Sequence, residues 1–277
     1  MIISLVSLAL GVVAALLTYF FTPLAALPWP HAFWIIPMSL GYGLGAFMIL
    51  VISFFLFCMA HPLEKDVKKP HRVAYWLVCQ IIQWLFGFLW IKAEITGVEK
   101  VPTDSRFLMV SNHTSMFDFL IVLAHLGRFH IIPILKKEAE HFPIAGKCSH
   151  YTGFIPIDRS NPKEGLRAIL KAVRFLKEDL SSIYIAPEGT RNKDGRMSSF
   201  HAGSFKIAQK AQVPVVIACV TGTQNVHSNF FRRFTHVRLD FLEVLSKEQV
   251  AEMTTVEMAE HSQELIQTRL DELEKKE

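Results

Sequence analysis

The first sixty residues contain two long apolar runs, Ile2–Thr22 and Phe33–Met59. Each run is long enough to cross a hydrocarbon core of roughly 30 Å as a helix. The segment between them holds Pro23, Pro28 and Pro30, which break helices. The pattern therefore predicts a hairpin of two transmembrane helices over residues 1–60.

The second run contains a small-residue motif, with Gly41 and Gly45 four positions apart and Gly43 between them. Such a motif lets a neighbouring helix approach closely. The alternative, that glycine is simply common in membrane helices, stays open.

Val73–Ile91 is a third uncharged stretch, and it contains three of the five tryptophans. Gln80 and Gln83 lie in its middle, and basic residues flank it at Arg72 and Lys92. This composition favours an amphipathic helix lying in the membrane interface. A third membrane span is the alternative.

Beyond Lys92 the apolar pattern alternates between strand-like and helix-like segments. Asn161 followed by Pro162 marks a helix start, after which apolar residues recur at helical spacing up to Leu180. Such alternation predicts an α/β fold with a mixed, mostly parallel sheet flanked by helices. The expected strands are 93–98, 106–111, 130–135, 154–157, 183–185, 213–220 and 237–242, and the other expected helices are 117–126 and 204–212.

The last residues, Thr255–Glu277, predict a polar helix with a narrow apolar stripe formed by Val256, Leu265, Ile266 and Leu270. The predicted organisation is an N-terminal transmembrane hairpin (1–60), a basic linker with the interfacial helix (61–91), an α/β domain (92–246) and a C-terminal polar helix (247–277).

The distribution of charge reinforces this division. All 29 Lys and Arg and all 25 Asp and Glu residues follow Ala60. A wholly soluble protein is therefore excluded unless the leader is cleaved. We expect it to be retained, because a signal peptide needs a positive region before its apolar run.

The basic residues that follow the second span indicate the topology of the hairpin. The turn between the spans carries no Lys or Arg, whereas Lys65, Lys68, Lys69 and Arg72 follow the second span. By the positive-inside rule this side is cytoplasmic. The chain is thus expected to be an integral membrane protein with its globular domain on the cytoplasmic face, typical of a bacterial inner membrane.

Other compositional features exclude several classes. The 51 % hydrophobic content excludes a disordered chain. The net charge of +4 does not indicate a nucleic-acid partner. The four cysteines form no CxxC pair and so indicate neither a zinc site nor a redox motif.

The first segment able to carry chemistry is His113–Asp118. On one regular helix these two residues would lie about 140° apart and would not meet. They meet if His113 lies in the turn after a strand and Asp118 in the first turn of the following helix. Asp118 would then hold one imidazole nitrogen and leave the other as a general base. A hydrogen-bonded structural histidine is the alternative.

Two further segments place polar groups at strand ends. Glu188, Gly189, Thr190 and Arg191 follow the strand 183–185, and the Arg191 guanidinium suits phosphate. Arg159 follows the strand 154–157. Ligands of open α/β sheets collect at such ends. A surface turn with an internal ion pair, and a solvated arginine, are the respective alternatives.

In this order the three segments resemble the glycerolipid acyltransferase family, whose signature is an HxxxxD block, a strand-borne arginine and an EGTR block. The similarity runs from about Ile95 to Val220 and is greatest to the 1-acylglycerol-3-phosphate acyltransferases. Pro156 departs from the apolar or aromatic residue that is usual in the arginine block.

The resemblance implies transfer of a fatty acyl group from acyl-CoA or acyl carrier protein to the hydroxyl of lysophosphatidic acid at a phospholipid membrane. It implies His113 as general base and Asp118 as the residue that orients it. It also implies Arg159 and Glu188–Arg191 as substrate-binding residues. It implies no metal, no cofactor and no covalent acyl-enzyme on Ser115.

Three alternatives remain at this stage. One is an acyltransferase acting on another lysolipid or on glycerol 3-phosphate, and another is a membrane-anchored protein that binds phospholipid without turnover. The third is a serine esterase, against which the absence of any G-x-S-x-G motif argues.

Overall fold

The computed structural model describes residues 2–21, 33, 35–60, 67–138, 145–158, 160–191, 197–230 and 232–275. The chain forms two compact units, residues 1–63 and 64–277. Each unit is described by itself below.

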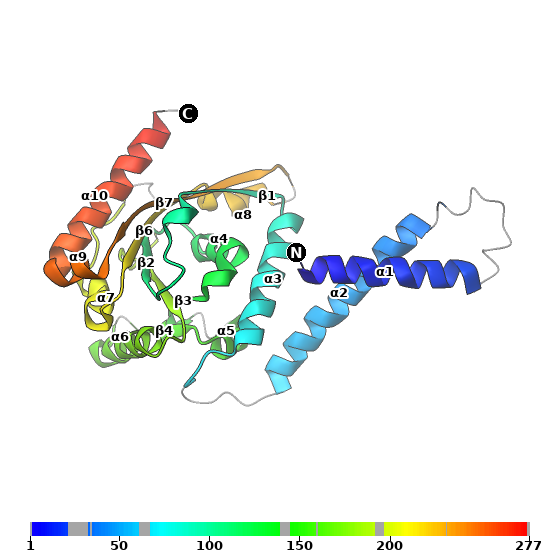
Figure 1. Ribbon diagram of the computed structural model, residues 1–277. Coiled ribbons are helices and arrows are strands. Elements are labelled where there is room, and N and C mark those ends of the chain that lie inside the picture. Colours follow the sequence, from blue (N-terminus) through cyan, green and yellow to red (C-terminus); the bar gives the residue numbers. More distant parts are fainter. Residues whose placement is uncertain are drawn as a thin grey trace. The chain divides into compact units, whose positions relative to one another are not determined.

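The N-terminal unit consists of helices α1 (Ile2–Phe21) and α2 (Ile35–Ala60), which pack against each other (Figure 1). Their backbones approach most closely where Gly11 faces Gly43. A Cβ on Gly11 would lie 2.2 Å from the Ser39 carbonyl oxygen and 2.5 Å from the Gly43 nitrogen. The prediction that Gly41 and Gly45 form the contact is wrong for this pair of helices, since a Cβ on either would meet nothing within 4 Å. The glycine at the contact is Gly43, which lies between them.

Among the described residues, one helical segment, Ile35–Met59, is both long and apolar enough to cross a membrane. Val6–Tyr19 within α1 is a shorter apolar segment. The predicted span over Phe33–Met59 thus coincides with an apolar helix, while the two-span arrangement remains a prediction.

The second unit is built on a sheet with strand order β1-β7-β6-β2-β5-β3-β4. The sheet contains a group of five adjacent strands that run parallel to one another, β6, β2, β5, β3 and β4. Strand β7 is antiparallel to β6 and parallel to β1. The mixed, mostly parallel sheet predicted from the sequence is therefore confirmed. The strands are β1 (Ile91–Thr96), β2 (Leu108–Ser111), β3 (Ile131–Lys136), β4 (Ile155–Ile157), β5 (Ser182–Ile185), β6 (Val215–Thr221) and β7 (Thr235–Leu245).

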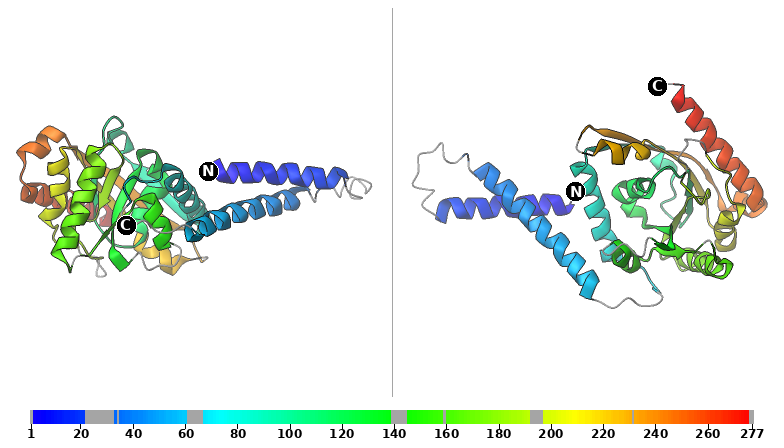
Figure 2. Two further views of the ribbon diagram at one scale, coloured as in Figure 1. Left: turned by 90° about the horizontal axis from the view of Figure 1, so that it is seen from below. Right: turned by 180° about the vertical axis from the view of Figure 1, so that it is seen from behind.

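Helices cover both faces of this sheet. Figures 1 and 2 show α3 and α10 on opposite sides of it, with α4 and α5 on the side of α3 and α6 and α7 on the side of α10. The α-helices are α3 (Arg72–Phe88), α4 (Phe117–Leu126), α5 (Ala145–Thr152), α6 (Pro162–Lys177), α7 (Lys206–Ala211), α8 (Val226–Asn229), α9 (Lys247–Glu252) and α10 (Thr255–Glu274). Short 3-10 helices are η3 (Val98–Lys100), η4 (Gly127–Phe129), η6 (Ala202–Phe205) and η7 (Thr223–Asn225).

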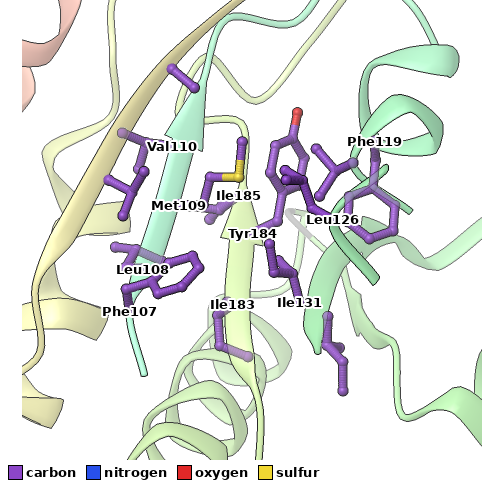
Figure 3. Packing of buried hydrophobic residues seen from close by; sticks show 14 of the residues in the cluster. Phe107, Leu108, Met109, Val110, Phe119, Leu126, Ile131, Ile183, Tyr184 and Ile185 are labelled. Atoms are coloured by element: carbon purple, nitrogen blue, oxygen red, sulfur yellow. The ribbon is translucent and has the colours of Figure 1, made fainter. Parts of the chain in front are cut away.

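The core lies between the sheet and these helices. Every residue of β2 and β5 is buried, as expected for strands that have parallel neighbours and helices on both faces. Figure 3 shows side chains of β2, β5 and β3 beside Phe119 and Leu126 of α4. The apolar face of α4 thus fixes the position of its first turn, which carries Asp118.

Local sequence signals account for several helix ends. Helix α4 has the predicted bounds, and the Asn161 side chain caps α6 by accepting the Lys163 N–H at 3.1 Å. Helices α5 and α8 were not predicted, and α9 is separate from α10 rather than part of one polar helix over 247–277. In α10 the predicted stripe is partly wrong, because Val256 is exposed whereas Met258 and Ala259 are buried with Ile266.

Helix α3 is an integral part of the second unit. The Tyr75 hydroxyl donates to the Ile131 carbonyl oxygen and accepts the Ile131 N–H, both at 3.0 Å. One face of α3 is therefore buried against the α/β layers, whereas Val73, Trp76 and Phe88 are exposed. An interfacial position for this helix stays a prediction.

Candidate active site

The predicted site residues follow strands that end at one edge of the sheet. β2 and β5 are adjacent and parallel, and β3 separates β5 from β4. Because parallel strands end at the same edge, the segments after them are neighbours there. His113 follows β2, and Glu188–Arg191 follow β5. Arg159, which follows β4, lies outside the described residues.

His113 and Asp118 have the geometry anticipated for a strand-to-helix turn. His113 lies in the turn after β2, and Asp118 lies in the first turn of α4. The His113 Nδ1 atom is 2.8 Å from Asp118 Oδ2. Because the carboxylate accepts at Nδ1, the neutral ring carries its proton there and Nε2 keeps its lone pair. No hydrogen bond from the described residues occupies Nε2, and about a quarter of the His113 side chain is exposed.

The Asp118 carboxylate is buried and surrounded by donors. Oδ2 also accepts the backbone N–H groups of Thr114, at 2.7 Å, and Ser115, at 2.8 Å. Oδ1 accepts the Thr114 hydroxyl at 3.1 Å and the Thr223 hydroxyl. These donors on both oxygens fix the plane of the carboxylate. Asp118 therefore orients His113 from a rigid position.

Asn112 fixes the beginning of the same turn. Its side chain is buried and forms two 2.8 Å hydrogen bonds with the backbone N–H and carbonyl of Val220 in β6. These bonds extend the pairing of β2 with β6 beyond Ser111, with the Asn112 side chain in place of a backbone group. The residue before His113 is thereby anchored to the sheet.

Glu188 joins the two halves of the site. It is only 2 % exposed, and its carboxylate accepts the His113 backbone N–H at 2.6 Å and the Ser198 N–H at 2.8 Å. The sequence did not indicate this bridging of three chain segments. Gly189 follows with a φ of +76°, a left-handed conformation that favours glycine. Thr190 and Arg191 are exposed beyond this turn.

Acyl transfer needs hydrogen-bond donors for an oxyanion, and the backbone N–H groups near His113 and Gly189 are candidates, but they are already engaged. The N–H groups of His113, Thr114 and Ser115 donate to carboxylates. The Gly189 N–H donates to the Ala186 carbonyl oxygen at 3.2 Å. These four groups therefore stabilise the turns, and an oxyanion donor has to come from elsewhere.

A neutral hydroxyl pair lies beneath the site. Burial raises the pKa of Tyr184 well above its usual value, and the charges of Asp118 and Glu188 raise it further. The Tyr184 hydroxyl is 2.8 Å from Ser111 Oγ. Burial likewise raises the pKa of the Cys219 thiol to about 12, so this cysteine is a poor nucleophile.

Three residues that support the site were not predicted from the sequence, namely Thr114, Thr223 and Asn112 in its anchoring role. Asn112 and Thr114 flank His113, so their proximity was available as a signal. Thr223 lies 105 residues from Asp118 in sequence. It arrives through β6, which pairs with β2, and nothing local to Thr223 marks it.

A comparison with known protein families points to the part of the chain that holds these site residues. Residues 92–221 match the family model described as Acyltransferase. This segment is therefore similar to acyltransferase domains. It contains β1 through β6, and therefore both His113–Asp118 and Glu188–Arg191.

Curated relatives carry a more specific name. The 1-acyl-sn-glycerol-3-phosphate acyltransferase of Limnanthes alba is 36 % identical over 145 residues, covering 52 % of this chain and 49 % of that protein. The alpha form from Ovis aries is 32 % identical over 157 residues, covering 57 % of this chain and 53 % of that protein. The chain thus spans about half the length of the curated relatives it matches.

A solved structure resembles most of the chain. The 1-acyl-sn-glycerophosphate acyltransferase PlsC from Thermotoga maritima superposes with a TM-score of 0.62 and 24 % identity. The match covers 81 % of this chain and 89 % of that one. At this identity the likeness establishes the fold.

Proposed function

We propose that this chain is a membrane-bound 1-acylglycerol-3-phosphate acyltransferase that converts lysophosphatidic acid to phosphatidic acid. The observation that carries the proposal is the pair formed by His113 and Asp118, with imidazole Nε2 left for substrate at the ligand-binding edge of the sheet. The names of the curated relatives supply the substrate class.

In the proposed reaction His113 acts as the general base. Nε2 takes the proton of the acceptor hydroxyl while that oxygen forms a bond to the thioester carbonyl carbon. The imidazolium formed is stabilised by the buried Asp118 carboxylate. Collapse of the tetrahedral intermediate breaks the carbon–sulfur bond, and the thiolate takes the proton from Nε2 to leave as a thiol. General-base assistance of this kind contributes about 10²–10⁴-fold.

The acceptor phosphate is assigned to the cationic residues that follow β4 and β5. Arg191 is exposed next to the Glu188 turn, where a guanidinium can hold a phosphate through two hydrogen bonds. Thr190 offers a further donor, and Arg159 is proposed as the second cation. Glu188 serves this arrangement by holding the turn against His113.

The reaction needs no covalent acyl-enzyme. Ser115 Oγ accepts the Phe117 N–H at 3.2 Å, a local contact at the start of α4. Acyl-CoA or acyl carrier protein enters as the second substrate, and the proposal requires neither a metal nor a cofactor.

A membrane position gives this site access to its lipid. We assign α2 as a membrane span and the basic segment after it, with the catalytic unit, to the cytoplasmic face. An exposed aromatic group supports an interfacial surface on that unit. The Trp90 and Phe234 rings lie 5.6 Å apart, and Lys92 Nζ is 4.4 Å from the Phe234 ring centre. Such a combination suits lipid headgroups. Protease accessibility of the catalytic unit in sealed vesicles of known orientation tests the assignment.

The activity is tested with the purified full chain in phospholipid vesicles. Lysophosphatidic acid and an acyl thioester, supplied in turn as acyl-CoA and acyl carrier protein, should give phosphatidic acid by mass spectrometry. His113→Ala should abolish the product while the protein still inserts. His236→Ala, at an exposed position on β7, should not affect it.

The same assay separates the alternatives. Release of fatty acid without an acceptor would indicate a hydrolase, and preferential consumption of glycerol 3-phosphate or a neutral lysolipid would indicate another acyltransferase. Lysophosphatidic acid binding without product would indicate a binding protein. Undiminished product with His113→Ala would refute the mechanism.

A further inference from the structure

We propose that Thr223 is a positioning residue for this reaction, acting on His113 through the Asp118 carboxylate. This inference rests on the function proposed above. Thr223 is fully buried, and its hydroxyl donates to Asp118 Oδ1. Its oxygen also lies 2.9 Å from Thr114 Oγ1. It belongs to neither of the segments from which the site was first assembled.

The backbone before Thr223 is constrained to place it there. Strand β6 ends at Thr221, and Gly222 then has a φ of +81°. A Cβ on Gly222 would lie 2.2 Å from the carbonyl oxygen of His236 in β7, so only glycine fits. The chain turns at this glycine, and η7 begins with Thr223 beneath the first turn of α4.

Donor counting shows what the Thr223 hydroxyl contributes. Each threonine hydroxyl has one proton, and a carboxylate oxygen can only accept. The hydroxyls of Thr223 and Thr114 each contact Asp118 Oδ1 and also contact each other. Two protons therefore serve three contacts, and removing the Thr223 hydroxyl takes away one of these protons together with the contact that holds Thr114.

The two carboxylate oxygens consequently have different tasks. Oδ2 receives His113 Nδ1 and two backbone N–H groups, and Oδ1 receives the two hydroxyls. Without the hydroxyl of Thr223, the charge on Oδ1 loses a donor in a site that water cannot reach. The carboxylate then tilts towards other partners, and the imidazole loses its fixed orientation.

The test compares Thr223→Val with Thr223→Ser in the full-length protein in phospholipid vesicles. Valine keeps the shape of threonine and removes the hydroxyl, and serine keeps the hydroxyl. Thr221→Val is the matched control, because this half-buried threonine of β6 makes no side-chain hydrogen bond among the described residues.

Thr223→Val should lower kcat about 10- to 100-fold, the usual effect of losing a hydrogen bond to a charged group. The KM for lysophosphatidic acid should stay within about twofold, because the substrate does not touch this residue. Thr223→Ser should restore most of kcat, and Thr221→Val should resemble the wild type. A merely structural role would lower the melting temperature without this split between kcat and KM.

A second measurement does not depend on turnover. Diethyl pyrocarbonate modifies neutral imidazole, and peptide mass spectrometry resolves His113 from exposed His236. Since the imidazole is then no longer held in one orientation, the rate of His113 modification should change at least about twofold in Thr223→Val, relative to that of His236. A wild type without acyl transfer would refute the proposed function but leave this measurement intact. Unchanged His113 modification, or unchanged kcat in Thr223→Val, would overturn the inference.

Discussion

Replacing Asp118 with asparagine distinguishes the contribution of its negative charge from the contribution of its hydrogen bonds. In Asp118→Asn the amide oxygen must take the place of Oδ2, because two of the donors there, the N–H groups of Thr114 and Ser115, belong to the backbone and cannot reverse. The amide NH₂ then takes the place of Oδ1, where the hydroxyls of Thr114 and Thr223 can rotate to accept. The turn therefore persists while the carboxylate charge is lost.

The magnitudes follow from these contacts. Asparagine should change stability by only about 0–2 kcal/mol, since weaker hydrogen bonds are offset by the removal of a buried charge. Alanine at position 118 leaves two backbone N–H groups without an acceptor, at about 1–3 kcal/mol each, and should lower the melting temperature by roughly 5–20 °C. Both variants should lose about 10²–10⁴-fold in kcat, the range that general-base catalysis contributes, because neither keeps the charge that stabilises the imidazolium.

The assay is the initial rate of phosphatidic acid formation, with melting temperatures measured by intrinsic fluorescence in the same detergent. Asp104→Asn, at an exposed position, is the control for loss of a carboxylate. An Asp118→Asn enzyme within tenfold of the wild-type kcat would refute the orienting role. An Asp118→Ala protein as heat-stable as Asp118→Asn would refute the reasoning on the backbone donors.

Three further predictions follow from the same contacts. Arg191→Ala should raise the KM for lysophosphatidic acid about tenfold or more with a smaller effect on kcat, and an unchanged KM would remove its phosphate-binding role. Gly222→Ala should lower the melting temperature and kcat together, since its Cβ would collide with the His236 carbonyl and displace Thr223; a melting temperature equal to wild type would contradict the assigned turn. Burial lowers the pKa of His130 from 6.5 to about 4, so the unfolded chain binds the extra proton first. The free energy of unfolding should therefore fall by about 3 kcal/mol as the pH drops from 6.5 towards 4, whereas above pH 6.5 His130 costs the folded state nothing. His130→Asn, which tolerates the φ of +51°, should flatten melting temperature against pH over this range, and an unaltered profile would show that another group is responsible.

Elements with strong local signals were predictable from the sequence. Helix α6 was marked by Asn161 and Pro162, and the apolar strands of the parallel group were found to within one or two residues. Helix α5 has no comparable apolar periodicity, so its sequence gave no sign of it. In α10 the buried face was misassigned because an apolar stripe can be drawn through Val256 or through Met258, and only packing on β6 and η6 chooses between them.

The candidate site divides in the same way. The His113–Asp118 geometry follows from a local strand-to-helix transition, so its spacing sufficed to anticipate it. The contacts from Glu188 to the His113 N–H and from Thr223 to Asp118 span 75 and 105 residues. They exist because β5 and β6 both pair with β2, an order that no local pattern encodes.

This order of strands explains why the turn after β2 is the place for chemistry. β2 is the central strand of the seven-stranded sheet and has a parallel neighbour on each side, so both neighbours deliver a group to the same turn. The segment after β5 brings Glu188 to the His113 N–H. Strand β6 provides the backbone of Val220, which binds the Asn112 side chain, and the turn after β6 brings Thr223 to Asp118. A turn restrained from both sides holds the imidazole without help from substrate. In the reaction proposed above, His113 is therefore preorganised as general base, and binding energy from the lipid remains available for the reacting groups.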